Sequence, residues 1–238
     1  MIADKRILAV VPARLGSKGL KRKNIKLLNN IPLINYSLNS LKNSKLVDKI
    51  FVSTESKKIQ NIVEKKNIKI DFLRPKNLSL DNSKTFDVVK HVILELRKND
   101  QNFDYVALIE PTSPLRKKND IDRAIKIFYK NRKKFDAIIS LGEVSETPNI
   151  LKKIDKNLKI FSAFRGLKKI HRRQDAEKYF FPYGVIYMAK INNFLKEKTF
   201  YCKRSMGMIL EQFQCYEIDD INDFICIEAL LKKYKKKL

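Results

Sequence analysis

The sequence predicts a single α/β domain in which a mainly parallel sheet is flanked by helices. Short apolar runs rich in β-branched residues alternate with longer amphipathic segments, and the connections between them are short. The 238 residues are enough for one domain with a sizeable core. Hydrophobic residues make up 44% of the chain and charged residues 32%, a balance typical of a globular protein.

Taken in order, the elements of the first part of the chain fit strand–helix alternation. Ligands of such sheets bind beyond the carboxyl ends of the strands. The segments after Pro12, Thr54 and Glu110 are therefore expected to build the site. The predicted strands are Ile7–Pro12, Ile50–Thr54, Ile68–Leu73, Tyr105–Glu110 and Ala137–Leu141. The predicted helices are Leu33–Asn43, Ser56–Lys66, Thr85–Lys98 and Asp120–Asn131.

The alternation is interrupted between residues 143 and 179. The runs Ile150–Ile154 and Lys159–Phe164, separated by turn residues, predict an inserted hairpin arm within a single domain of residues 1–238. The arm's apolar side chains have no place in a compact α/β core, so we expect it to pack on a second copy of the chain. Beyond the arm, the pattern predicts strands at Val185–Ala189 and Tyr216–Ile218 and a closing helix at Asp219–Tyr234.

The net charge of +25 raises the possibility of a nucleic-acid partner. The lysines are spread along the whole chain, however, and no element interleaves basic with aromatic residues. We therefore expect a solvated basic surface that attracts anionic substrates, and no nucleic acid. A non-catalytic basic binding protein is the alternative that charge alone supports.

The apolar stretches, the cysteines and the histidines indicate the cellular compartment and limit the possible metal sites. The apolar stretches are too short to span a bilayer, and the run before Pro12 is interrupted too soon for an export signal, so we expect a cytoplasmic protein without membrane insertion. The cysteines and histidines are widely spaced, which favours neither disulfides nor a zinc site.

The segment that follows the first predicted strand, residues 13–24, is a candidate phosphate-binding loop. Gly16 and Gly19 permit close backbone approaches, and Arg14 and Lys18 supply cations for phosphate oxygens. The spacing matches neither a Walker loop nor G-x-G-x-x-G. The position after the first strand and the cluster of basic residues favour phosphate binding over a plain surface loop.

Near the end of the chain, Glu217 and Asp219 lie two residues apart on a predicted strand, which would direct both carboxylates to one face. Such a pair repels unless a cation lies between its members. Mg²⁺ takes one or two carboxylates together with phosphate oxygens, so the pair predicts a Mg²⁺–nucleotide site. The alternative is that Asp219 caps the last helix.

Several motifs in a fixed order resemble the acylneuraminate cytidylyltransferases, the CMP-sialic acid synthetase family. The segment Val11–Asn24 resembles the opening V-P-A-R-x-G-S-K-G-x-x-x-K-N. One short match would be weak, but the ordered set spans nearly the whole chain. The other segments that carry the resemblance are Val52–Glu55, Arg74–Val88, Pro111–Arg116, Arg173–Tyr187 and Glu217–Phe224.

The resemblance implies a Rossmann-like nucleotidyltransferase fold of the glycosyltransferase-A type. It implies transfer of CMP from CTP to the anomeric hydroxyl of an acidic nine-carbon sugar, a nonulosonic acid, with release of pyrophosphate. It also implies Mg²⁺ as cofactor and a homodimer in which the arm lies near the partner's active site. A 3-deoxy-manno-octulosonate cytidylyltransferase, which shares fold and nucleotide, is the alternative.

The resemblance also implies roles for individual residues. Arg14, Lys18 and Asp219 are expected to be catalytic, and Asp219 and Glu217 to bind the metal. The expected nucleotide-binding residues are Ala13, Arg14, Gly16, Ser17, Lys18, Asn24, Arg74 and Thr85, although Thr85 also suits a helix N-cap and Arg74 a surface position. The expected sugar-binding residues are Glu110, Thr112, Ser113, Arg116, Arg173, Gln174 and Tyr183, with Arg173 on the sugar carboxylate.

Two positions depart from the family pattern. Glu110 stands where the family has Gln, and Tyr183 stands where it has Asn. Both positions lie at the family's sugar site, so these changes favour a bacterial relative of sialic acid such as legionaminic or pseudaminic acid. No histidine is suitably placed for a general base, and that role stays unassigned.

Overall fold

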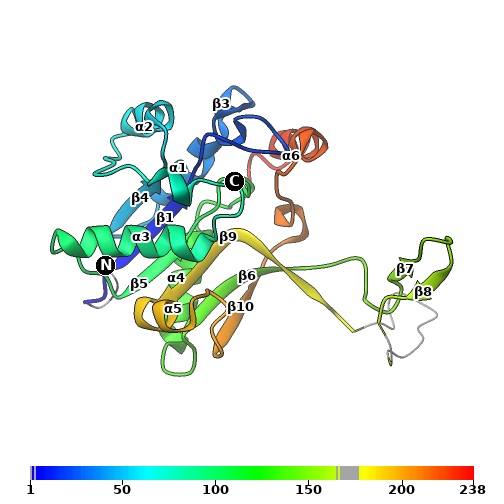
Figure 1. Ribbon diagram of the computed structural model, residues 1–238. Coiled ribbons are helices and arrows are strands. Elements are labelled where there is room, and N and C mark those ends of the chain that lie inside the picture. Colours follow the sequence, from blue (N-terminus) through cyan, green and yellow to red (C-terminus); the bar gives the residue numbers. More distant parts are fainter. Residues whose placement is uncertain (1, 3, 165, 167–176) are drawn as a thin grey trace.

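The computed structural model describes residues 2, 4–164, 166 and 177–238. Its centre is a 6-stranded sheet with the strand order β10-β6-β9-β5-β1-β4 (Figure 1). The strands are β1 (Ile7–Pro12), β4 (Lys49–Ser53), β5 (Tyr105–Leu108), β6 (Ala137–Glu143), β9 (Phe180–Lys190) and β10 (Ser205–Ile209).

The sheet is mixed but mainly parallel. Strand β1 pairs in parallel with β4 and β5, and β10 pairs in parallel with β6. Strand β9 runs antiparallel between β5 and β6. The predicted α/β class is therefore confirmed. The central antiparallel strand was not predicted, because alternation of elements does not fix their order in a sheet.

Helices flank this sheet (Figure 1). Among the described residues, no helix is long and apolar enough to cross a membrane. The helices are α1 (Leu33–Lys42), α2 (Lys57–Glu64), α3 (Thr85–Lys98), α4 (Asp120–Asn131), α5 (Ile191–Glu197) and α6 (Ile221–Lys233). Short elements connect them: η1 (Lys23–Ile25), β2 (Leu27–Leu28), β3 (Ile31–Pro32), η2 (Lys76–Leu78) and η4 (Gln212–Gln214).

The core forms because the strands are apolar on both faces and each helix presents an apolar stripe. All side chains from Ile7 to Val11 in β1 are fully buried. Helix α3 contributes Val89 and Val92 to the same core, and α4 contributes Ile125 and Phe128. A second, smaller cluster joins α6 through Phe224 and Ile227 to the segment after β1. This second cluster places the start of α6 beside the predicted phosphate-binding loop.

Two predicted strands are wrong. The segment Ile68–Leu73 has no regular secondary structure and pairs with no strand. It buries Ile68 and Ile70 in the core and stacks Phe72 on Phe51, with 4.5 Å between ring centroids, so apolar burial alone accounts for its sequence pattern. The segment Tyr216–Ile218 also forms no strand.

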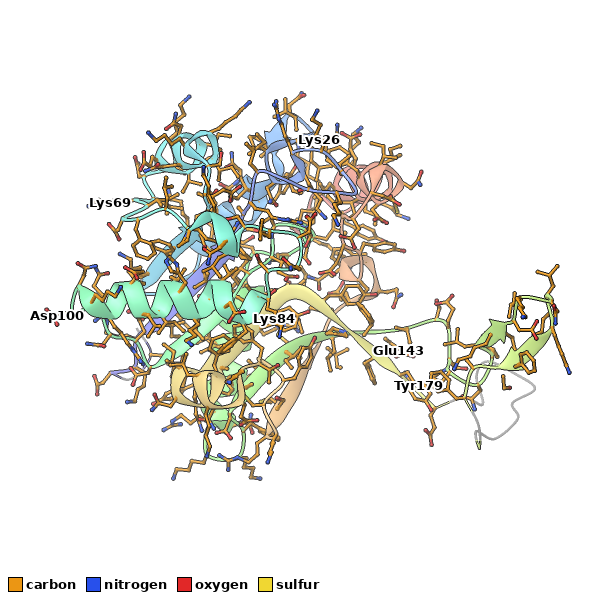
Figure 2. All side chains as sticks on the ribbon, in the orientation of Figure 1. Lys26, Lys69, Lys84, Asp100, Glu143 and Tyr179 are labelled. Atoms are coloured by element: carbon orange, nitrogen blue, oxygen red, sulfur yellow. The ribbon has the colours of Figure 1, made fainter. Side chains whose placement is uncertain are left out.

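The arm appears as the hairpin of β7 (Lys152–Ile154) and β8 (Ile160–Ser162), which projects from the body of the molecule (Figure 1). Glu143 and Tyr179 mark its base, where β6 and β9 leave the sheet (Figure 2). Apolar side chains of the hairpin are exposed to 64% at Ile154, 80% at Leu158 and 64% at Ile160. A hairpin therefore lies where one was predicted.

Candidate active site

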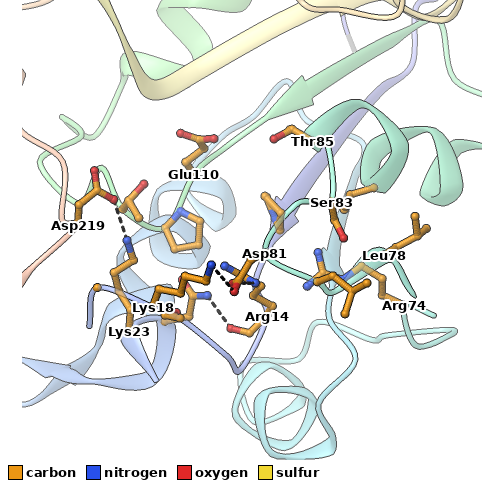
Figure 3. Close-up of a pocket in the computed structure, with 18 residues that line it drawn as sticks. Arg14, Lys18, Lys23, Arg74, Leu78, Asp81, Ser83, Thr85, Glu110 and Asp219 are labelled. Atoms are coloured by element: carbon orange, nitrogen blue, oxygen red, sulfur yellow. Dashed lines mark hydrogen bonds and ion pairs between the residues drawn. The ribbon is translucent and has the colours of Figure 1, made fainter. Parts of the chain in front are cut away.

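A cavity of about 410 Å³ lies at the carboxyl ends of β1 and β5, where the sheet topology predicted a site (Figure 3). Its wall combines the loop after β1, the segment between η2 and α3, the residues after β5, and Asp219 shortly before the last helix. It brings together many residues that are distant in sequence. Those expected to act on ligands are Arg14, Ser17, Lys18, Asn24, Arg74, Thr85, Glu110, Thr112 and Asp219.

The loop after β1 is fixed by side chains that contact its backbone. Asn24 donates from Nδ2 to the carbonyl oxygen of Arg14 at 2.8 Å. Glu55, which follows β4, accepts the Leu15 backbone N–H at 2.7 Å and a guanidinium N–H of Arg74 at 3.1 Å. Glu55 therefore holds both the loop and the arginine. In the sequence, Glu55 was recognised only as the last residue of the Val52–Glu55 motif, and no contact was predicted for it.

Arg74 is buried, and burial lowers the pKa of its guanidinium while the Glu55 carboxylate opposes that shift. The alternative of a surface arginine is therefore wrong. Thr85 is the first residue of α3 rather than its cap, which is Lys84, so the capping alternative is wrong as well. Both Arg74 and Thr85 line the cavity.

Two residues expected at the nucleotide lie outside the residues that line the cavity. Ala13 is fully buried, and its backbone N–H donates to the Ser53 carbonyl at 2.9 Å, which continues the pairing of β1 with β4. Gly16 lies on the loop nearby but not in the wall. Ala13 and Gly16 therefore shape the backbone of the loop and do not line the cavity.

Arg14 and Lys18 share one carboxylate. Arg14 Nη1 lies 2.6 Å from Asp81 Oδ1, and Lys18 Nζ lies 3.1 Å from Asp81 Oδ2 (Figure 3). Hydrogen bonds from Arg14 and then Lys18 hold the pKa of the Asp81 carboxyl below its usual range. Asp81 lies within the Arg74–Val88 segment that carries the family resemblance, but no role was predicted for it, because the motif does not show which groups its carboxylate contacts.

Asp219 projects into the cavity with its side chain 84% exposed. Lys23 donates to Asp219 Oδ1 at 3.0 Å and to the Ile218 carbonyl at 2.6 Å. A side chain at Gly19 would collide with the Asp219 carbonyl oxygen, so the close approach of loop and chain requires glycine there. The cap of α6 is Asp220, which accepts the N–H groups of Asn222 and Asp223, so the capping alternative for Asp219 is wrong.

The strand on which the paired carboxylates were predicted is absent, and Glu217 also contacts other groups. Its Oε1 accepts the Ser113 hydroxyl at 2.7 Å and the Gly184 backbone N–H at 2.6 Å. Because no strand forms at Tyr216–Ile218, the predicted alignment of Glu217 and Asp219 on one face of a strand is wrong. The described residues hold no cluster of three or more Asp, Glu, His or Cys suited to a metal. Asp219 offers an exposed carboxylate at the cavity, which fits Mg²⁺ whose other ligands are phosphate oxygens and water.

The structure does not support contact between Arg116 and a sugar. The side chain is buried and lines neither this cavity nor the one described below. It donates to the carbonyl oxygens of Val185, Glu110 and Gly184 at 2.7, 2.5 and 2.6 Å, and to the Ser37 hydroxyl at 2.9 Å. Its guanidinium therefore ties the end of β5 to β9.

The other expected sugar residues are scattered. Ser113 and Tyr183 line neither cavity, and the Tyr183 ring packs edge-on against Phe181 at 5.2 Å. Thr112 lines the first cavity, and its carbonyl accepts the Ile218 N–H at 2.9 Å. Arg173 and Gln174 lie outside the described residues.

A second cavity of about 300 Å³ adjoins the first, because Thr85 and Glu110 line both. Aromatic rings form much of its wall, and two lysines stand at it. None of them was among the predicted site residues, because aromatic side chains in α3, α5, β9 and the segment after α5 also suit the core. These residues are Phe86, Tyr187, Phe194, Phe200 and Tyr201, with Lys84 and Lys198.

Glu110 stands between the two cavities against the backbone of Gly184. Its carboxylate accepts no hydrogen bond from any described residue. Burial, and then the charge of Glu217, raises the pKa of Glu110 to about 7. Protonation therefore stabilises the folded state: the benefit is complete below pH 4.5, the ordinary value, and is lost as pH rises through about 7.

We expect Glu110→Gln to raise the melting temperature by several degrees at pH 8 and to change it little at pH 5. The reason is that glutamine keeps the shape and cannot ionise. Melting curves across this pH range test the prediction, with Glu64→Gln on the exposed surface of α2 as the control for the charge change. An equal shift at both pH values would show that ionisation of Glu110 has no energetic cost.

This cavity, with cations on a glycine-containing loop beyond a parallel strand, defines a nucleotide-binding α/β protein of the nucleotidyltransferase class. The family described as Cytidylyltransferase matches residues 8–237. The chain belongs to this family, as its ordered motifs predicted.

Individual relatives are consistent with that membership. The chain is 30% identical over 235 residues to N-acylneuraminate cytidylyltransferase of Escherichia coli, covering 98% of this chain and 54% of the relative. It is 30% identical over 240 residues to CMP-N,N'-diacetyllegionaminic acid synthase of Legionella pneumophila, covering 98% of this chain and 99% of the relative. The chain thus spans about half the length of some curated relatives and nearly all of others.

The fold also matches a solved structure of CMP:2-keto-3-deoxy-manno-octonic acid synthetase in complex with CTP. The TM-score is 0.68 at 14% identity, over 96% of this chain and 99% of that one. This similarity confirms the predicted Rossmann-like nucleotidyltransferase fold.

Proposed function

We propose that the protein transfers CMP from CTP to the anomeric hydroxyl of a nonulosonic acid and releases pyrophosphate. The observation that carries this proposal is the pair of adjoining cavities. One is lined by cations on the loop after β1, and the other by aromatic rings and lysines. The names of the relatives support CTP and a nine-carbon sugar acid as substrates. With CTP as donor, the cytoplasm remains the expected compartment.

In this proposal the first cavity binds CTP. Arg14 and Lys18 contact the phosphates, and Asn24 and Arg74 keep the loop and the wall in place through the contacts described above. The anomeric hydroxyl attacks the α-phosphorus, and the bond to the β-phosphate oxygen breaks as pyrophosphate leaves. Negative charge grows on that leaving group, and nearby cations stabilise it. Lys23, which lines the same cavity, adds a third cation beside Asp219.

Asp219 is the residue we propose to hold Mg²⁺ together with the nucleotide's phosphate oxygens. When bound, the ion supplies charge neutralisation and lowers the pKa of a coordinated hydroxyl. Lys23 pairs with the same carboxylate, so it would keep Asp219 directed into the cavity. Glu217 stays a proposed second ligand: its Oε1 accepts the hydrogen bonds described above, so it would bind the ion through Oε2.

We propose the second cavity for the sugar. Its aromatic walls suit acyl groups, and Lys84 and Lys198 suit a carboxylate. Glu110, shared by both cavities, would face the hydroxyl groups near the reacting centre. A nonulosonic acid is favoured over 3-deoxy-manno-octulosonate, because the relatives at 30% identity are named for nine-carbon acids. The octonic acid synthetase shares the fold at 14% identity.

The test of the nucleotide half of the proposal is the choice of nucleotide. We expect pyrophosphate release in the presence of a nonulosonic acid to be strongly selective for CTP over UTP, ATP and GTP. Pyrophosphate release is measured with purified protein, Mg²⁺, the nonulosonic acid and each triphosphate in turn. Comparable turnover with UTP would contradict the cytidylyltransferase proposal, and release without any sugar would indicate simple hydrolysis.

We also propose a homodimer held by the arm. The hairpin exposes Ile154, Leu158 and Ile160, and Phe161 and Phe164 are also exposed. Exposed apolar clusters of this kind mark protein interfaces. Light scattering at micromolar concentration should therefore give twice the mass of the chain. The double variant Ile154→Lys with Ile160→Lys should be a monomer whose α/β domain melts at the same temperature as in the wild-type protein. A wild-type monomer would contradict the proposal.

A further inference from the structure

We infer that Asp81 is a positioning residue that competes with the triphosphate for Arg14 and Lys18. This inference rests on the proposed function, because it concerns how CTP enters the first cavity. The geometry is specific: one carboxylate binds both cations, one through each oxygen, at 2.6 and 3.1 Å. All three side chains line the same cavity (Figure 3).

The arrangement cannot persist unchanged when a triphosphate binds to these cations. Arginine and lysine donate to phosphate oxygens in the same way as to carboxylate oxygens, so Asp81 occupies the position that phosphate oxygens need. A triphosphate carries several negative charges and therefore outcompetes a single carboxylate. The pairs are also easily broken, since Lys18 is 79% exposed and Asp81 is 43% exposed.

The position of Asp81 in the chain connects this exchange to the rest of the wall. It lies between η2 and α3, in a segment whose Leu80 and Ser83 also line the cavity. Arg14 Nη1 additionally donates to the Ser79 carbonyl at 3.4 Å. The segment of residues 79–83 is therefore attached to the phosphate loop mainly through Arg14 and Lys18. Transfer of these cations to CTP would release that attachment and let the segment adjust to the nucleotide.

The consequence is that Asp81 weakens nucleotide binding and speeds release of pyrophosphate. Asp81→Asn removes the competing charge and keeps the shape. We expect it to bind both CTP and inorganic tripolyphosphate about tenfold more tightly than wild type, the scale set by exposed ion pairs. Asp81→Glu keeps the charge and should bind within about twofold of wild type. The gain should shrink at about 0.5 M salt, which screens exposed charges.

Isothermal titration of the full chain with CTP and with tripolyphosphate, without and with Mg²⁺, tests this inference. The matched control is Asp71→Asn, because Asp71 also bridges two lysines, Lys49 at 2.9 Å and Lys69 at 3.4 Å, away from the cavity. It changes the net charge equally and should leave both affinities unchanged. Melting curves confirm that each variant is folded.

Two results would overturn the inference. One is an Asp81→Asn protein that binds tripolyphosphate no more tightly than Asp71→Asn does. The other is an Asp81→Asn protein that binds CTP more weakly than wild type when Mg²⁺ is present and not when it is absent. That result would make Asp81 a ligand of Mg²⁺. Failure of the wild-type protein to bind CTP at all would instead contradict the proposed function, and the tripolyphosphate titration would still decide the role of Asp81.

Discussion

Asp219→Asn should reduce the rate of CMP transfer about a hundredfold or more, which corresponds to roughly 2.7 kcal/mol of transition-state stabilisation. The substitution keeps the shape of the side chain and removes the negative charge proposed to hold Mg²⁺ at the cavity. The side chain is 84% exposed, and its ion pair with Lys23 is open to solvent, so the fold should be unaffected. Turnover at saturating Mg²⁺ and a melting curve on the same protein measure both effects.

The neighbouring residue supplies the control. Asp220 caps α6 through the N–H groups of Asn222 and Asp223, and Asn is an equally good cap. Asp220→Asn should therefore retain activity and stability, although it makes the same chemical change one residue away. Near-normal activity of Asp219→Asn would show that Asp219 does not hold the metal. Its ion pair with Lys23 would then be its remaining role.

Arg116→Met should destabilise the protein by about 3 to 5 kcal/mol, the range found when one partner of a buried charged network is removed. The guanidinium donates to carbonyl oxygens of Val185 and Gly184 in β9, and methionine leaves these acceptors without their donor. For a chain of this length the melting temperature should fall by roughly 10 °C.

Lys98→Met is the control for Arg116, because this lysine is 68% exposed and pairs with the partly exposed Glu95 in α3. It should cost less than about 1 kcal/mol. If Arg116→Met instead kept its melting temperature and lost only affinity for the sugar, Arg116 would be a sugar ligand and its structural role would be wrong.

The sequence predicted most of the regular fold because apolar periodicity is local. Helices α3 and α4 coincide with the predicted segments, and β1 does as well. The segment Ile68–Leu73 shows the limit of that signal. Its isoleucines are buried as they would be in a strand, yet no neighbour pairs with its backbone. Periodicity reports burial of side chains and not the partners of N–H and C=O groups.

The candidate site was predictable only in part. The loop after β1 was predicted correctly as part of the site, because it follows a strand end and contains two glycines. Several of its residues line the cavity. Arg116 could not be interpreted in advance, since an arginine in a motif gives no indication whether its guanidinium faces a ligand or the carbonyls of a neighbouring strand. Asp81 and Lys23 lie in motif segments, but their roles depend on ion pairs with residues far away in the sequence, which no local pattern encodes.

The most direct test of the central proposal is identification of the product. The protein is incubated with CTP, Mg²⁺ and, in separate reactions, N-acetylneuraminic, diacetyllegionaminic, pseudaminic and 3-deoxy-manno-octulosonic acids, and each mixture is analysed by mass spectrometry. We expect a CMP conjugate of at least one nine-carbon acid, formed in a one-to-one ratio with pyrophosphate. A CMP conjugate of the eight-carbon acid alone, or no conjugate of any of them, would contradict the proposed function.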